Sequence, residues 1–240
     1  MKRLSSFKEF LNESDDEISY SFSELSPKAQ ENALESMRDI NIDSDWWHED
    51  LIENFKAEME EEYGFSVDDV QYTGFWSQGD GASFTGRSED SDLFMRKGLG
   101  ITTSTELIDM GEESKSSDDE DLYGLMGDLR DVGFDARTRY KPDDFYFSVV
   151  RNSSRYSHEN TISGEVEVDE IDIEDDDERD FNGLVDELAE NTTEWARDKS
   201  RELYSRLEKE YEWLSSAEAV QETIESLDYK FDEDGNPIDV

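Results

Sequence analysis

The residues best suited to chemistry lie in a glycine-rich segment in the first half of the chain. This segment reads Phe75-Trp76-Ser77-Gln78-Gly79-Asp80-Gly81-Ala82. Backbone N–H groups beside such glycines can turn toward an anion or a carbonyl group, and a tryptophan can stack on a ligand. Trp76, Gln78 and Asp80 are therefore candidate binding residues. The favoured interpretation is structural, because a tight turn needs glycine for positive φ and Trp76 then belongs to the core.

A second group of uncommon polar side chains surrounds one of the two histidines. Arg151, Arg155, Tyr156, His158 and Glu159 lie close together near the end of an expected strand. A histidine beside a glutamate has the residue types for acid–base catalysis. However, adjacent strand residues point to opposite faces, and no nucleophile or orienting third group accompanies this pair. We therefore keep Arg151, His158 and Glu159 as candidate binding residues, expect Arg151 to pair with a carboxylate, and predict no catalytic residue.

The composition restricts the classes of function. The chain has 66 Asp and Glu against 23 Lys and Arg, a net charge of −43, and no cysteine. Such charge repels nucleic acid and anionic membranes, and the lack of cysteine excludes disulfides, thiolate chemistry and Cys-containing zinc sites. Low hydrophobicity with high charge is typical of disorder, but the 12% of aromatic residues indicates a folded core. We expect no metal or cofactor, because runs of carboxylates usually form a solvated face and residues 232–237 do not fit a calcium loop.

The acidity suggests that the surface imitates a nucleic acid. Spread evenly over a compact protein of this size, the net charge is about twofold less dense than that of duplex DNA. Mimicry therefore requires the charge to be concentrated, and the exposed side of helix 180–214 is one place for it. The other predicted acidic surface residues are Asp118, Asp119, Glu120, Glu165, Glu167, Asp169, Glu170, Asp175, Asp176 and Asp177. Solubility at high concentration is the competing explanation.

The elements that position these residues follow from the spacing of apolar side chains. Three-four spacing predicts helices, one opened by Ser26 and Pro27, one from Asp43 or Ser44 to Gly64, one over 121–131, one over 180–214 and one capped by Ser215 and Glu218. Alternation predicts antiparallel strands over 70–76, 82–87, 134–140, 145–151 and 161–168. The expected fold is α+β, with a mostly antiparallel sheet, flanking helices and one long C-terminal helix. We expect a linker over 14–21, a folded domain over 22–232 and a tail over 233–240.

Two helices have a specific expected buried stripe. In the second helix this stripe is Trp47, Leu51, Phe55 and Met59. In the last helix it is Val220, Ile224 and Leu227.

The N-terminus differs from the rest of the chain. Residues 1–13 are net positive, and their Phe7-Lys8-Glu9-Phe10-Leu11-Asn12-Glu13 forms a short amphipathic pattern. This segment resembles the capsid-targeting sequence of the internal head proteins of T-even-like bacteriophages. The resemblance implies docking on the phage scaffold core and cleavage by the prohead protease after Leu11-Asn12-Glu13. The body, with Trp47, residues 75–82 and residues 156–161, is similar to an uncharacterised group of phage-encoded proteins.

Together these observations predict a phage accessory protein. It would be packaged in the virion interior, delivered to the host cytoplasm with the genome, and bind a host defence or nucleic-acid enzyme through that enzyme's basic nucleic-acid-binding groove. It would bind neither nucleic acid nor membrane directly. One alternative is a purely structural internal head or scaffold protein. A second is a small enzyme, which a concave pocket would favour if it joined Trp76, Gln78, Asp80, Arg151 and His158.

Overall fold

The computed structural model describes residues 19–43, 46–101, 142–152, 156–169 and 178–238. The predicted targeting segment 1–13, helix 121–131 and strand 134–140 lie outside these residues. The chain divides into two compact units, which are treated separately below. Unit 2 is Asp50–Glu208, and unit 1 combines Met1–Glu49 with Lys209–Val240.

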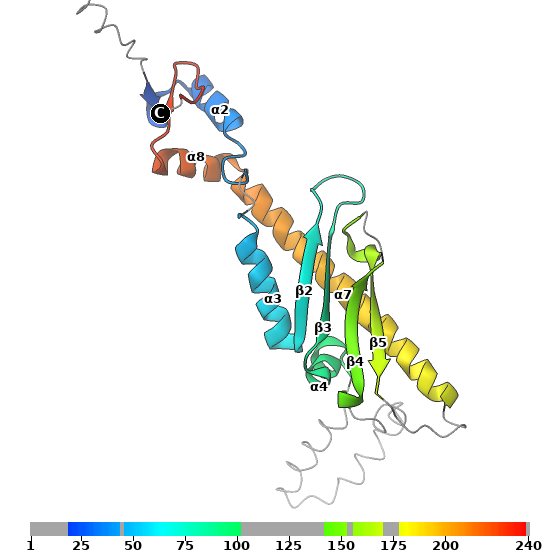
Figure 1. Ribbon diagram of the computed structural model, residues 1–240. Coiled ribbons are helices and arrows are strands. Elements are labelled where there is room, and N and C mark those ends of the chain that lie inside the picture. Colours follow the sequence, from blue (N-terminus) through cyan, green and yellow to red (C-terminus); the bar gives the residue numbers. More distant parts are fainter. Residues whose placement is uncertain (1–18, 44–45, 102–141, 153–155, 170–177, 239–240) are drawn as a thin grey trace, which may run out of the picture. The chain divides into compact units, whose positions relative to one another are not determined.

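Unit 2 is built on a four-stranded antiparallel sheet. Its strands are β2 (Phe65–Tyr72), β3 (Ala82–Ser88), β4 (Phe145–Arg151) and β5 (Ile162–Val168), and they pair in this order (Figure 1). The predicted hairpin and the two later strands are thus confirmed. The first strand, however, begins at Phe65 and ends at Tyr72, so Trp76 lies in the loop that follows it.

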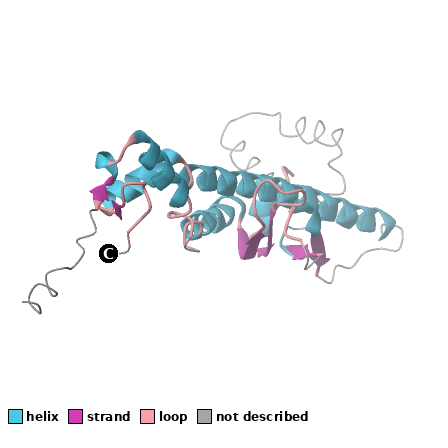
Figure 2. Cartoon of the chain, turned by 90° about the horizontal axis from the view of Figure 1, so that it is seen from above, coloured by secondary structure: helices cyan, strands magenta, loops and turns pink. Residues whose placement is uncertain are grey.

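Three helical segments pack on one face of this sheet. They are α3 (Glu49–Tyr63), α4 (Ser91–Leu93) with the π-helical turn η2 (Phe94–Gly98), and the long α7 (Glu178–Leu214). The last of these confirms the predicted C-terminal helix, which Figure 2 shows running along one side of the strands. The face is filled by aromatic side chains, of which Phe55, Phe65, Phe84 and Phe94 are fully buried.

The other face of the sheet is open. In β4 the side chains of Phe145, Phe147 and Val149 are buried, whereas Tyr146 between them is exposed. This alternation follows from the pleat, which directs successive side chains to opposite faces. Of the described α-helices, none packs on the Tyr146 side, although the turn over 159–161 lies against β3 and Ser83 on this side is buried.

A bulge in β2 decides which residues share the open face. The register with β3 shifts between Val67 and Asp69, so two residues oppose one there. Gly86 of β3 lies against this bulge, and a Cβ on Gly86 would lie 2.1 Å from the carbonyl oxygen of Ser66. Glycine is therefore required at position 86 for close backbone approach rather than for an unusual φ.

Unit 1 joins the two ends of the described chain. The strand pair β1 (Tyr20–Ser21) and β6 (Lys230–Phe231), the turn η1 (Phe22–Glu24) and the helices α2 (Pro27–Ser36) and α8 (Ala217–Ser226) belong to it. Its core consists of Phe22, Leu25, Ala29, Ala33, Val220, Ile224 and Phe231. The side chain of Ser26 accepts the N–H of Ala29 at 3.3 Å, as the predicted cap requires.

Three predicted boundaries or burials are wrong. The last helix is capped by Ser216, whose hydroxyl accepts the N–H of Ala219. Ser215 cannot cap it, because α7 continues to Leu214 and the hydroxyl of Ser215 donates to the carbonyl of Tyr211 in α7. Leu227 is 62% exposed, since it lies beyond the end of α8. The second helix begins at Glu49, and Trp47 precedes it in a turn, where its ring meets that of Tyr211 at 5.9 Å.

An ion-pair network links α3 to α7 within unit 2. Arg206 donates to both carboxylate oxygens of Glu58, at 2.5 and 3.0 Å, and also to Glu202. The hydrogen bond from Arg206 lowers the pKa of Glu58. The arginine therefore holds together two acidic helices that would otherwise repel each other.

The tight packing at Gly86 predicts a large effect of one methyl group. Gly86→Ala should lower the free energy of unfolding by about 2–3 kcal/mol, because the backbone of β2 must move to admit it. Gly183→Ala is the matched control, since nothing lies within 4 Å of its added Cβ and alanine favours the helix. Urea unfolding followed by aromatic circular dichroism measures both. Equal midpoints for the two variants would contradict this account.

The Arg206 network predicts a pH-dependent contribution to stability. Arg206→Gln should cost about 1 kcal/mol near neutral pH, whereas Arg201→Gln should cost less, because its pair with Asp198 is more exposed. A carboxyl whose folded-state pKa is lowered stabilises the protein above its ordinary pKa and loses this effect as the pH falls. The cost of Arg206→Gln should therefore shrink below about pH 4. A cost that is constant from pH 7 to pH 3 would refute the role of Glu58.

Candidate binding surface of the sheet

The two segments singled out in the sequence meet at one end of the sheet. Residues 73–81 connect β2 to β3, and residues 152–161 connect β4 to β5. A Cβ added to Gly81 would lie 2.5 Å from the Cβ of His158, so the two loops touch. Ser157 also donates its hydroxyl to the side-chain oxygen of Gln71 at 3.3 Å. The two loops therefore meet at Gly81 and His158, although these residues are far apart in the sequence.

Hydrogen bonds within the first loop fix its shape. The carboxylate of Asp80 accepts the N–H of Ser77 at 2.7 Å, and the N–H of Asp80 donates to the carbonyl of Ser77 at 3.1 Å. Gly81 and Thr73 close the loop through two further hydrogen bonds, of 3.1 and 3.0 Å. The predicted residue Asp80 thus has a structural partner, while Gln78 is exposed at the tip.

Trp76 is on the surface, contrary to its favoured placement in the core. Its side chain is 64% exposed, and its φ of 74° is left-handed. Phe75 takes the inward position instead, with its ring 5.5 Å from that of Tyr204 on α7. This exchange is not visible in the sequence pattern, because either aromatic residue satisfies it.

The histidine caps a short turn. His158 precedes the turn η4 (Glu159–Thr161), and its Nδ1 accepts the N–H of Asn160 at 3.1 Å. The expectation that His158 and Glu159 are opposed on a strand is therefore wrong. The turn brings both toward Gly81, with Oε2 of Glu159 3.5 Å from the added Cβ.

Arg151 pairs with a carboxylate, as predicted. Its two terminal nitrogens lie 3.2 and 3.3 Å from the same oxygen of Asp69. This ion pair joins β4 to β2 across the sheet. Arg155 lies outside the described residues.

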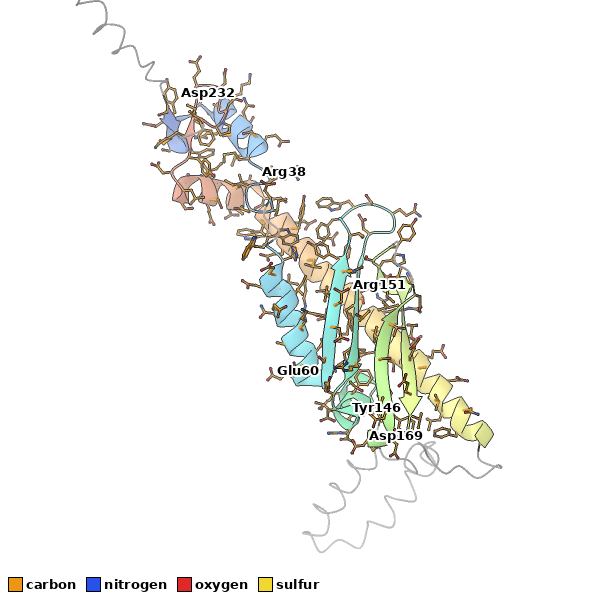
Figure 3. All side chains as sticks on the ribbon, in the orientation of Figure 1. Arg38, Glu60, Tyr146, Arg151, Asp169 and Asp232 are labelled. Atoms are coloured by element: carbon orange, nitrogen blue, oxygen red, sulfur yellow. The ribbon has the colours of Figure 1, made fainter. Side chains whose placement is uncertain are left out.

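The open face carries the exposed acidic residues Glu165, Glu167 and Asp169, as predicted. The β4–β5 register places Glu165 opposite Ser148 and Glu167 opposite Tyr146. The hydroxyl of Tyr146 donates to Asp169 at 3.0 Å, and this bond raises the pKa of Tyr146. Figure 3 shows Tyr146 and Asp169 at the end of the sheet opposite to Arg151.

Further carboxylates on this side were missed in the sequence. They come from the bulge in β2, from the end of β3 and from the turn η3 (Pro142–Asp144), and they are Asp68, Asp69, Glu89, Asp143 and Asp144. The cation Arg87 is paired with Glu89 at 3.0 Å. Short acidic pairs beside predicted strands are the only sequence signal for this group. The predicted Asp118, Asp119, Glu120, Glu170, Asp175, Asp176 and Asp177 lie outside the described residues.

Cations lie among the many carboxylates of α7. Of these, Lys199, Arg201 and Arg206 are each ion-paired with a carboxylate. Among the described residues, no three acidic or histidine side chains are grouped to hold a metal ion, and no helix is long and apolar enough to cross a membrane.

The contact between the loops predicts a local effect. In Gly81→Ala the new methyl group collides with His158, and the turn that is capped by His158 should therefore loosen. The N–H of Thr161, which donates to the carbonyl of His158 at 2.8 Å, should then exchange about tenfold faster with solvent. Gly74→Ala is the control, since the nearest atom to its Cβ is 3.9 Å away. Unchanged exchange in Gly81→Ala would show that the loops do not depend on each other.

The comparisons with known proteins give a family but no activity. No curated protein and no solved structure matches the chain. The sequence model of one family, described as a domain of unknown function (DUF8835), matches residues 47–217. This range includes the whole of unit 2, and therefore both loops and the open face of the sheet. Because the match spans well over half of the chain, the protein belongs to the DUF8835 family.

Proposed function

We propose that the protein is an acidic inhibitor that occupies the basic nucleic-acid-binding groove of a host protein. The observation that carries this proposal is the open face of the sheet in unit 2. Carboxylates line this face from β2, β5 and the adjoining turns, and the nearby cations Arg87 and Arg151 are each paired with one of them.

The spacing of a sheet suits this role. Alternate residues of one strand lie about 6.8 Å apart and neighbouring strands about 4.8 Å apart, so carboxylates on one face form a regular array. The array is fixed by backbone pairing and lies over a buried aromatic core, so little ordering cost is incurred on binding. Opposite charge steers a basic partner toward it, with a strong dependence on salt.

The N-terminal resemblance extends the proposal to delivery. Residues 1–13 would dock on the scaffold core of a phage head, and the prohead protease would cut after Glu13. The acidic body would then travel with the genome into the host cytoplasm. Mass spectrometry of purified virions tests this part. A mature N-terminus at Ser14 supports packaging, and absence of the protein from particles refutes it.

A matched pair of variants tests the binding face. Glu165→Gln/Glu167→Gln removes two charges from the open face, and Glu60→Gln/Glu61→Gln removes two from exposed positions of α3 (Figure 3 labels Glu60). Host proteins are captured on the immobilised wild-type chain at low salt and eluted with duplex DNA, and the eluted protein is purified. Its dissociation constant should rise about tenfold for the β5 variant and little for the α3 variant.

Three results would contradict the proposal. The first is that duplex DNA fails to displace the captured proteins. The second is that both variants weaken binding equally. The third is that binding does not depend on salt. A protein that is abundant in virions and captures no DNA-displaceable partner would instead be a structural component of the head.

A further inference from the structure

We propose that Trp76 is an anchor of this binding surface and receives an arginine or lysine side chain of the partner. The inference rests on the proposed function and deepens it by naming a contact residue and the chemistry it recognises. The open face of the sheet alone is too small to form one side of a stable interface. Four strands of about seven residues form a face of about 450 Å², whereas each side of a stable interface covers about 800 Å². The contact must therefore extend beyond the face, and the loop that contains Trp76 follows β2 at one end of the sheet.

Trp76 is held in place rather than merely exposed. Phe75 is buried against Tyr204 and Tyr72, with ring separations of 5.5 and 6.2 Å, and its ring meets that of Trp76 at 5.9 Å. The hydroxyl of Tyr204 donates to the carbonyl of Gly74 at 3.2 Å. These contacts fix the loop on both sides of Trp76. A fixed aromatic side chain loses little entropy on binding, which is why tryptophan is common among residues that dominate interfaces.

The left-handed backbone conformation of Trp76 also supports a role for this residue in binding. Bulky residues other than glycine rarely adopt a φ near 74°, and such conformations cluster at functional sites. A glycine here would relieve the strain and keep the hydrogen bonds of the loop that use backbone groups and the side chains of Asp80 and Thr73. The indole side chain, rather than the backbone of the loop, therefore explains why tryptophan occupies this position.

The charges around the indole select the partner. The carboxylate of Asp80 is held in the same loop by the N–H of Ser77 at 2.7 Å, and burial, together with Asp80 and Glu208, raises the pKa of Tyr204 beneath the loop. Glu159 and the half-exposed Tyr156 belong to the neighbouring loop. Aromatic faces beside carboxylates favour a cation, and the planar guanidinium of arginine stacks best. The same carboxylates repel the phosphates of a nucleic acid, so stacking of a nucleobase is disfavoured.

The test uses an octa-arginine peptide as a defined probe on the full chain. Its affinity is measured by calorimetry, and the indole N–H signal of Trp76 is followed by NMR. Trp76→Ala should weaken binding about tenfold, and Trp76→Phe should keep part of the affinity. Trp213→Ala is the matched control, because Trp213 is 48% exposed but belongs to unit 1. Octa-lysine should bind more weakly than octa-arginine.

The outcomes separate this inference from the function on which it rests. Trp76→Ala with wild-type affinity, an unshifted indole signal, or an equal loss in Trp213→Ala would overturn the anchor. Binding of single-stranded DNA at Trp76 would overturn the choice of a cation. If Glu165→Gln/Glu167→Gln weakens peptide binding while Trp76→Ala does not, the acidic face stands and only the anchor fails. If neither variant weakens it, both fail.

Discussion

The buried indole of Trp195 is the contact on which unit 2 depends. Its ring lies 4.8 Å from Phe94, 4.9 Å from Phe65, 5.7 Å from Tyr63 and 5.9 Å from Phe84. These partners come from η2, β2, the end of α3 and β3, so one side chain of α7 joins every layer. Edge-to-face and tilted ring pairs of this kind add to the burial of large apolar areas. This offsets the repulsion within a chain of net charge −43, whose composition is otherwise typical of disorder.

Because the apolar residues of unit 2 are concentrated on the helix-covered face of the sheet, the opposite face is left to polar and charged residues. A four-stranded sheet needs only one buried face, and the described α-helices of unit 2 cover only that face. The carboxylates that a sheet cannot bury then collect on the open face and at its ends. In this protein the acidic array is thus a product of the fold as much as of composition. The loops that contain Trp76 and His158 lie at one end of this sheet.

The sequence predicts the elements well where periodicity is strong. The strand over 145–151 and the long helix to Leu214 have nearly the predicted bounds, because each has a long, regular apolar pattern. Periodicity fails at the bulge in β2, since one extra residue reverses which positions share a face. Val67 and Val70 therefore lie on the same side, and Asp68 and Asp69 are left exposed.

The candidate site was only partly visible for a related reason. Alternation identifies Phe75 and Trp76 as neighbours on opposite sides but does not say which one is buried, because that depends on Tyr204 from α7. The capping role of His158 likewise depends on a turn that the strand pattern did not indicate. Such features arise from contacts between distant segments, which one sequence does not reveal.

The most direct test of the account is to map which carboxylates a basic partner covers. The complex with the DNA-displaceable host protein is labelled with a carbodiimide and glycine ethyl ester, and modified Asp and Glu residues are quantified by mass spectrometry. We predict that Glu165, Glu167 and Asp169 are protected in the complex, while Glu60 and Glu61 on α3 react as in the free protein. Equal labelling of the open face with and without the partner, or protection confined to α3, would contradict the central claim.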